Sequence, residues 1–128
     1  MKKYTEKDLK TFKRNEQGWL ICPSGDYTEI RTFPEKCAFG SWCDFGEGCS
    51  HEGLTNSIYV AVDRIGSELR KTYFFKAEEG YFVRAGCFFG TIDEFKEQVH
   101  KTRRGTIHET TYRMACELAV KLLDSQWK

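Results

Sequence analysis

Residues 35–52 form three consecutive hexads, Glu-Lys-Cys-Ala-Phe-Gly, Ser-Trp-Cys-Asp-Phe-Gly and Glu-Gly-Cys-Ser-His-Glu. Each hexad has Cys at its third position and a ring residue at its fifth, and the ring positions continue backwards through Phe33 to Tyr27. A period of six is neither the helical period nor a plain two-residue alternation. The pattern in residues 27–53 is typical of one face of a β-solenoid coil, or of a ribbon that folds back with a turn in each repeat.

Three hexads are too few to bury a core, because terminal repeats have no neighbour on which to stack. We therefore expect the rest of the chain to cover them. The length of 128 residues predicts a single domain, residues 1–128, with a core that needs no disulfides. The net charge of +1, the absence of a long apolar run and the lack of a signal peptide predict a cytoplasmic protein that binds neither DNA or RNA polymers nor membranes.

The segment before the hexads predicts an N-terminal helix over residues 4–15. Thr5 and Asp8 fit an N-terminal cap with an acidic third position, and Leu9 and Phe12 give a thin apolar stripe. The remaining positions are rich in Lys and Arg. Such a helix is expected to be a solvated arm or a clamp on a second subunit.

Residues 19–90 predict an irregular β core that contains the hexads. Alternating or β-branched runs bounded by Gly, Pro and Asp indicate the strands. They are expected at residues 19–22, 27–33, 57–63, 69–76 and 81–89, the last three as an antiparallel meander.

Residues 91–127 predict a helix pair. Thr91 and Glu94 form a capping box for a helix that extends to about Thr102, and a second helix extends from about Ile107 to near Trp127. The expected fold class is α+β: an irregular antiparallel β core with a hexad-repeat ribbon, one N-terminal helix and a C-terminal helix pair.

The cysteine pattern favours packing over chemistry. Cys37, Cys43, Cys49 and His51 would supply four zinc-competent ligands, but zinc sites usually place Cys two to four positions apart. Regular five-residue gaps instead put each Cys at the same place in successive repeats. No Gly-rich phosphate loop, serine elbow or nucleophile motif is present, so we expect a binding protein without metal, cofactor or catalysis.

Arginine and aromatic residues beside turns are the candidate ligand groups. The guanidinium forks of Arg31, Arg64, Arg84 and Arg113 suit phosphate, because each donates two parallel charge-assisted hydrogen bonds. Trp19 offers a flat face for a purine. The alternative for each Arg is a solvated or salt-bridged side chain, and for Trp19 and Phe82 it is core packing.

These motifs resemble a known family of phage proteins. The hexads, the segment 63–67, the run Arg84-Ala85-Gly86-Cys87-Phe88-Phe89-Gly90-Thr91-Ile92-Asp93-Glu94-Phe95 and the final helix pair are similar to the Thoeris anti-defence 1 family of phage and prophage proteins. The likeness covers most of the chain from Trp19 onward. It implies a sponge that binds the cyclic ADP-ribose signal of the host TIR-domain protein without cleaving it, and that forms homo-oligomers.

The resemblance also implies roles for particular residues. It suggests Trp19 as the stacking ring, Arg31 and Arg113 as phosphate forks, and Tyr112 and Thr106 for contact with the sugar and for closing the pocket. Phe82 is a further candidate ligand-binding ring, apart from the resemblance. Arg64 and Gly66 would form a second site for cyclic oligonucleotides. The chain departs from the family pattern at residues 103–106, where Arg-Arg-Gly-Thr replaces a His-Gly-Asp-Asn-like segment, so Thr106 replaces an Asn contact only in part.

Other functions remain as alternatives. A phage inhibitor that blocks a host defence enzyme by direct protein contact would need an exposed apolar patch. A nucleic-acid module would use the basic residues near the first helix and at 101–104, and a phosphodiesterase would cleave the signal rather than hold it.

Overall fold

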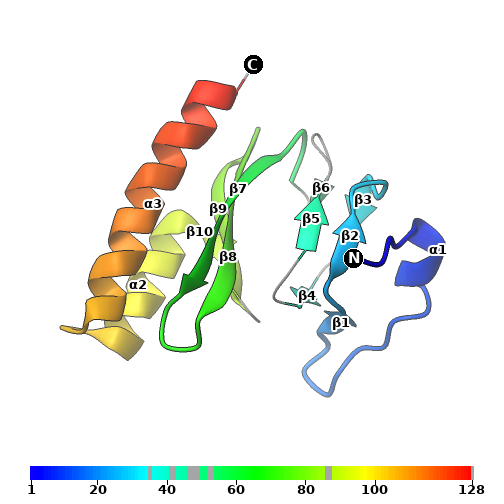
Figure 1. The fold of residues 1–128 in the computed structure, drawn as a ribbon, viewed down its shortest axis with the longest axis horizontal. Helices are drawn as coiled ribbons and strands as arrows, with labels where there is room; N and C mark the ends of the chain where they lie inside the picture. The colour runs from blue at the N-terminus through cyan, green and yellow to red at the C-terminus, as the bar shows by residue number, and fades with distance from the viewer. Residues whose placement is uncertain (35, 41–42, 46–49, 52–53, 86–87, 128) are drawn as a thin grey trace.

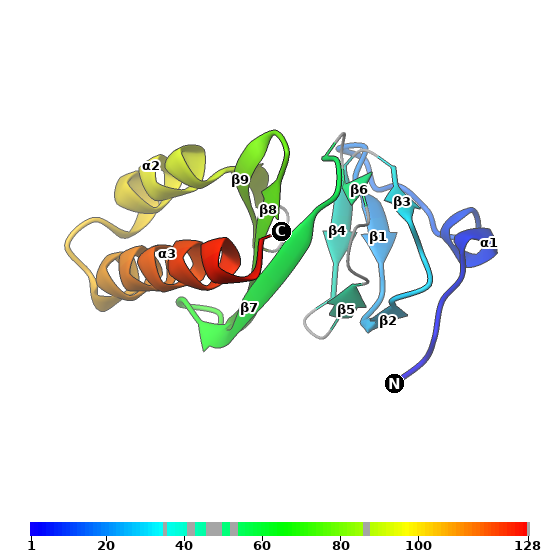
Figure 2. The ribbon, with the colours of Figure 1, turned by 90° about the horizontal axis from the view of Figure 1, so that it is seen from above.

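The computed structural model describes residues 1–127 except 35, 41–42, 46–49, 52–53 and 86–87. A four-stranded sheet stands between two other layers, with a helix pair on one face and a small β-solenoid on the other (Figures 1 and 2). This arrangement has three helices and a mostly antiparallel sheet, so the predicted α+β class is confirmed.

The hexads form a β-solenoid. Strands β1 (Leu20–Cys22), β2 (Gly25–Tyr27) and β3 (Thr32–Phe33) make one coil, and β4 (Cys37–Phe39), β5 (Cys43–Phe45) and β6 (Ser50–His51) make the next. The coils stack in parallel as β1–β4, β2–β5 and β3–β6. Gly25 pairs with Cys43 and Thr32 with Ser50, 18 residues apart, and Leu20 pairs with Cys37, 17 residues apart, so one coil takes about three hexads. The solenoid interpretation is therefore confirmed, and the folded-back ribbon is wrong.

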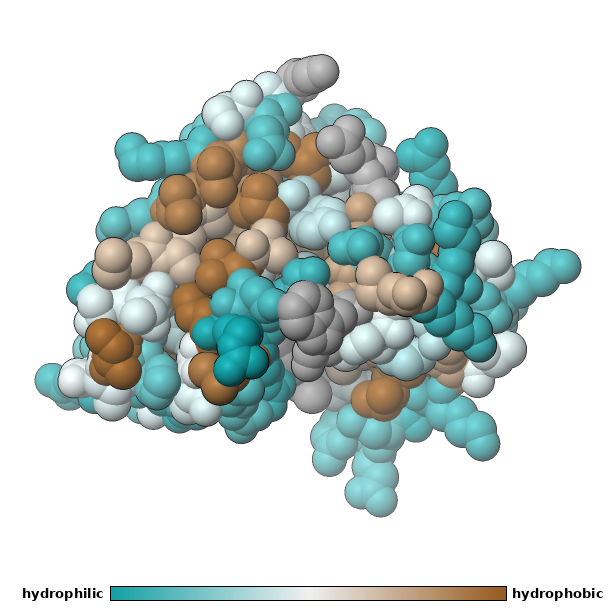
Figure 3. Space-filling view, in the orientation of Figure 1, coloured by the Kyte–Doolittle hydropathy of each residue, from teal (hydrophilic) through white to brown (hydrophobic). Residues whose placement is uncertain are grey.

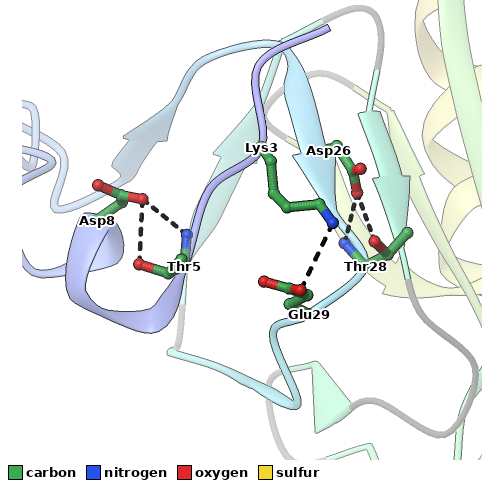
Figure 4. Close-up of polar contacts among 6 residues, drawn as sticks. All are labelled: Lys3, Thr5, Asp8, Asp26, Thr28 and Glu29. Carbon is green, nitrogen blue, oxygen red and sulfur yellow. Dashed lines mark hydrogen bonds and ion pairs between the residues drawn. The ribbon is translucent and has the colours of Figure 1, made fainter.

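The single strand predicted over residues 27–33 is wrong, because it spans a corner of the coil. β2 ends at Tyr27, and the Asp26 carboxylate accepts hydrogen bonds from both the N–H and the hydroxyl of Thr28, at 2.9 and 2.6 Å (Figure 4). The Ile30 N–H then donates to the Tyr27 carbonyl at 3.0 Å. An Asp that bonds two residues ahead is a turn signal, and it outweighs the local alternation here.

The helix predicted over residues 4–15 is also wrong in length. Helix α1 is Glu6–Leu9, one turn, and its capping box forms as expected, with Asp8 accepting from the Thr5 N–H at 2.7 Å (Figure 4). The chain then leaves the helix because Lys13 accepts a bond from the Ile21 N–H at 3.0 Å. The backbone around Lys13 pairs with β1, and these hydrogen bonds take the place of further helical ones.

The sheet is an antiparallel meander of β7 (Ile58–Ile65), β8 (Arg70–Ala77), β9 (Gly80–Ala85) and β10 (Phe88–Thr91). The strands predicted at 57–63 and 69–76 correspond to β7 and β8. The single strand predicted at 81–89 is wrong, because β9 and β10 fold against each other with Phe89 opposite Arg84. Residues 86–87, between β9 and β10, lie outside the described residues.

The predicted helix pair is confirmed as α2 (Ile92–Arg103) and α3 (Ile107–Gln126). Both bonds of the Thr91–Glu94 capping box are present, at 2.8 and 3.1 Å. Helix α3 packs along β7 and β8, and α2 packs beside β9 and β10 (Figure 2). No described helix combines the length and the apolar character that crossing a membrane requires.

The two faces of the sheet contribute to two cores. Tyr73 and Phe75 point toward the solenoid, where they meet a dense group of rings around Phe45. Phe74 and Val83 point toward the helices and pack with Phe95 and its neighbours. The described cysteines are all buried, which confirms the packing prediction for Cys22, Cys37, Cys43 and Cys116. Cys49 and Cys87 lie outside the described residues.

Candidate functional site

The sheet separates the residues that sequence reasoning assigned to one ligand. Arg113 lies on α3, on the helix side, whereas Arg31 lies just before β3 in the solenoid (Figures 1 and 2). Each lines a different hollow. One protomer therefore does not bring these two arginines to the same phosphate.

Tyr112 and Arg113 do share a hollow, which we name the helix cleft. It lies between α2 and α3 and has a volume of about 210 Å³. Apolar side chains and one tyrosine form its floor, and three basic groups and one carboxylate surround it. The lining residues are Phe95, Lys96, Val99, His100, Glu109, Tyr112, Arg113 and Cys116. A flat ring with an attached anion is the chemistry that such a lining suits.

Tyr112 is held in place from two sides. Its ring meets Phe95 edge-on, with 5.1 Å between centroids and planes at 90°. On the other side Gly66 approaches so closely that a Cβ there would lie 2.0 Å from the Tyr112 hydroxyl oxygen. Burial raises the pKa of Tyr112, so its hydroxyl remains a hydrogen-bond donor at neutral pH. Gly66, predicted for a separate site, is thus a packing partner of Tyr112.

Glu109 links the two helices at the entrance of the cleft. One carboxylate oxygen lies 2.5 Å from His100 Nδ1, and the other accepts the Gly105 N–H at 3.1 Å. The Gly105 N–H, followed by His100, lowers the pKa of Glu109. Thr106 is the N-cap residue of α3, and its hydroxyl donates to the Arg103 carbonyl at 2.7 Å, so it shapes the turn between the helices.

A second hollow of about 170 Å³ lies on the far side of Phe95 and Tyr112. Arg103 lines it and donates from Nη2 and Nε to the Ser67 hydroxyl, at 3.0 and 3.3 Å. Sequence reasoning placed Arg103 among the basic residues of the nucleic-acid alternative but gave it no role in binding the signal. Arg64 is exposed at a bulge in β7, and the described lining of this hollow does not include it.

Phe82 and Arg84 face the solenoid from β9. Phe82 lies parallel to Phe89, with 5.9 Å between centroids and 8° between planes, and packs against the solenoid core. The Arg84 guanidinium carbon lies 4.6 Å from the centre of the Phe89 ring. Phe82 therefore packs against other aromatic rings on the solenoid side of the sheet, away from the helix cleft.

Trp19 and Arg31 belong to the solenoid layer. Trp19 is half-buried before β1, and its backbone N–H donates to the Asn15 side chain at 2.9 Å. Arg31 is exposed and lines a shallow hollow with two acidic and one further basic residue, Glu6, Glu29 and Lys7. The charges there balance, so this hollow has no net attraction for an anion.

The described thiols are poorly suited to catalysis. Burial raises the pKa of Cys116 to about 11 and that of Cys43 above its ordinary value, so both are protonated at neutral pH. Among the described residues, no three His, Cys, Asp or Glu side chains are grouped to hold a metal. Cys49 and the side chain of His51, from the zinc alternative, lie outside what the structure describes.

Comparison of the chain with models of known families, with curated proteins and with solved structures found no match.

Proposed function

We propose that this protein is an anti-defence sponge of a phage or prophage. It binds the glycocyclic ADP-ribose signal of bacterial Thoeris immunity in the host cytoplasm and holds it without degrading it. The observation that carries the proposal is the helix cleft, in which Tyr112 and Arg113 share a hollow with Lys96 and His100. A cyclic oligonucleotide site around Arg64 has less support, because Gly66 packs against Tyr112.

The cleft offers the two kinds of contact that such a signal needs. Arg113, with Lys96 beside it, can donate charge-assisted hydrogen bonds to the pyrophosphate. The rings of Phe95 and Tyr112 form an apolar wall for a base. Nanomolar affinity corresponds to about −12 kcal/mol, and a preorganised cleft lowers the cost of reaching it.

One cleft is too small to enclose the whole signal. Its volume of about 210 Å³ lies below the range of about 300–1,000 Å³ that is usual for sites of drug-sized ligands. We therefore propose that a second copy of the chain completes the site. The exposed position of Arg113 on α3 fits a ligand that is covered from outside.

The outer face of α3 carries an apolar stripe that a second copy would bury, across the helix from the cleft, because Arg113 lies about 140° around α3 from Leu118. Its exposed residues are Ile107, Met114, Leu118 and Leu122, with exposed fractions of 67, 61, 54 and 39 %. Figure 3 shows apolar side chains gathered over this part of the molecule. Residues spaced by four form a ridge along a helix. Such a ridge packs well against the same ridge of a second copy, with the helix axes crossing at about −50°.

Charges beside the stripe fit an antiparallel dimer centred on Leu118. Glu117 and Lys121 are exposed on the same side of the stripe. A two-fold axis at Leu118 brings Glu117 of one copy beside Lys121 of the other, and the pair occurs twice. These two pairs of opposite charges favour the antiparallel arrangement of the helices over a parallel one.

The test is direct capture of the signal. Purified protein is mixed with cyclic ADP-ribose from a Thoeris TIR enzyme, and unbound ligand is removed by filtration. The protein is then heat-denatured, and the released compound is identified by mass spectrometry. We expect to recover intact signal in a fixed ratio to protomers. The Arg113→Gln variant should capture no signal, whereas Arg104→Gln, a control in the exposed turn, should capture as much as the unaltered protein. Absence of captured signal overturns the proposal, and an altered product shows an enzyme instead.

A second candidate function is favoured by the same α3 stripe. An inhibitor that blocks a host defence enzyme by direct contact would use Met114, Leu118 and Leu122 as its docking surface. It would not depend on Arg113. Inhibition of the purified host enzyme by Arg113→Gln at full strength, with no captured signal, would favour this function over the sponge.

A further inference from the structure

His100 and Glu109 join the two helices at the entrance of the helix cleft. His100 Nδ1 lies 2.5 Å from a Glu109 carboxylate oxygen, and both side chains line the cleft. Imidazole is the side-chain group whose charge ordinarily changes between about pH 5 and 8. We propose that His100 is a proton-dependent contact for a phosphate bound in the helix cleft, and that Glu109 positions its ring. This role rests on the proposed function of the cleft, and it adds that binding there takes up a proton.

Glu109 determines which nitrogen of the His100 ring a ligand meets. The Gly105 N–H and then His100 lower the pKa of Glu109, so its carboxylate is ionised at neutral pH and only accepts hydrogen bonds. Nδ1 of His100 therefore carries a hydrogen, and Nε2 is the nitrogen that remains for a ligand.

The charge of the ring decides what Nε2 does. In a neutral imidazole with its hydrogen on Nδ1, Nε2 is an acceptor, and its lone pair repels a phosphate oxygen. In the imidazolium both nitrogens donate, and a hydrogen bond from Nε2 to phosphate is then charge-assisted. Because the protonated ring is the form that binds the anion, affinity should fall as the pH rises through the range in which His100 loses its proton.

The carboxylate that holds the ring is itself fixed. Its other oxygen accepts the Gly105 N–H at 3.1 Å, in the turn between α2 and α3. The Glu109 side chain is 22 % exposed, whereas that of His100 is 57 % exposed. The ring can therefore exchange its proton with water and reach a ligand at the entrance, while the less exposed carboxylate keeps it in one orientation. A contact held in this way is preorganised for its ligand.

The groups around His100 do not change charge with it. The described lining of the cleft comes from α2 and α3, and its other titratable residues are Lys96, Glu109, Tyr112, Arg113 and Cys116. Lysine and arginine keep their charge between about pH 5 and 8. Burial raises the pKa of Tyr112, and it raises that of Cys116 to about 11, so both are neutral in this range. Lys101, next to His100, pairs with Glu97 at 3.5 Å.

Titration calorimetry of the full chain tests this role. The probes are cyclic ADP-ribose from a Thoeris TIR enzyme and inorganic pyrophosphate, each at about pH 6 and at about pH 8. Titrations midway between these pH values, in two buffers that differ in ionisation enthalpy, give the protons taken up on binding. His100→Gln removes the titrating group, and Glu109→Gln removes the carboxylate at the same size. His108→Gln is the matched control, because His108 lies in the first turn of α3 and outside the described lining of the cleft.

We expect the unaltered protein to bind a probe about tenfold more weakly at the higher pH than at the lower, with a net uptake of protons. His100→Gln should bind at the lower pH as weakly as the unaltered protein does at the higher, and should take up no proton. Glu109→Gln should weaken binding at the lower pH alone, because it acts through the protonated ring, whereas a merely structural role would weaken binding equally at both. His108→Gln should behave like the unaltered protein.

The outcomes separate this role from the sponge function. Capture of cyclic ADP-ribose with equal affinity at both pH values would overturn the role of His100 and leave the sponge function standing. A pH dependence that persists in His100→Gln would also overturn it, since another group would then be titrating. If pyrophosphate binds with the expected pH dependence but cyclic ADP-ribose does not bind, the sponge function fails and the role of His100 stands. Binding of neither probe overturns both.

Discussion

Gly66 lies against the ring of Tyr112, and the contact leaves no room for a side chain. A Cβ on Gly66 would lie 2.0 Å from the Tyr112 hydroxyl oxygen and 2.7 Å from its ring carbon Cζ. The backbone of Gly66 also has φ of +84°, which favours glycine. The turn between β7 and β8 thus sets the position of the ring that separates the two hollows beside α2.

Replacement of this glycine should both strain the turn and displace Tyr112. We expect Gly66→Ala to lower the free energy of unfolding by about 2–4 kcal/mol, from backbone strain and overpacking together. Gly105→Ala is the matched control, because Gly105 also has positive φ, +74°, but an added Cβ would meet nothing within 4 Å. It should cost about 1 kcal/mol from backbone strain alone. Urea denaturation of both variants measures the difference, and equal losses would show that the Tyr112 contact is unimportant.

Much of the fold was predictable because its signals are local. The capping box of Thr91 and Glu94 marks the start of α2, and the hexads mark the solenoid. The first coil was recognised only in part: Tyr27 and Phe33 keep the ring position of the pattern, but Gly25 stands where the second coil has Cys43. Alternation around Tyr27 then resembled an ordinary strand. A stacked coil is set by pairing with residues 17 or 18 positions away, which the first coil's own residues do not show.

The site was predictable only where its residues are neighbours in the chain. Tyr112 and Arg113 are adjacent on α3 and enter the same cleft. Grouping Arg31 with Arg113 required knowledge of which face of the sheet each segment covers, and the structure places them on opposite faces. The burial of Arg84 between Phe39 and Phe89 depends on the packing of two distant segments, so no local pattern indicated it.

Phe45 should be the side chain that most strongly joins the solenoid to the sheet. Its ring lies 5.1 Å from Tyr73 and 5.4 Å from Tyr59, across the boundary between the two layers. We expect Phe45→Ala to lower the free energy of unfolding by about 3–5 kcal/mol, because the cavity it leaves is enclosed. Phe12→Ala, at the edge of the same core, should cost less than half as much. Thermal and urea denaturation measure both, and a small loss in Phe45→Ala would show that the layers are joined elsewhere.

Glu109 should make the free energy of unfolding depend on pH. Its pKa is lowered in the folded state by the Gly105 N–H and by His100, so it stabilises the fold above the ordinary glutamate pKa of about 4.3. That contribution is lost as the pH falls through the lowered folded pKa. We expect Glu109→Gln to melt earlier than the unaltered protein at neutral pH, with the gap closing in acid. Glu97→Gln, which breaks an exposed pair with Lys101, is the control. A melting gap that stays constant with pH would show that the Glu109 contacts carry no charge-dependent stability.

Leu118 should decide whether the chain forms a dimer through the α3 stripe. It is 54 % exposed at the centre of the α3 stripe, where the two-fold axis would place it against its own copy. Leu118→Lys puts two like charges at that contact and removes apolar area, so we expect a monomer in light scattering after gel filtration. Leu69→Lys is the control, because Leu69 is equally exposed, at 54 %, but lies in the turn between β7 and β8. Because the stripe and the helix cleft lie on opposite sides of α3, Leu118→Lys should leave the capture of cyclic ADP-ribose unchanged. A Leu118→Lys protein that still elutes as a dimer would show that the chain does not dimerise through the stripe.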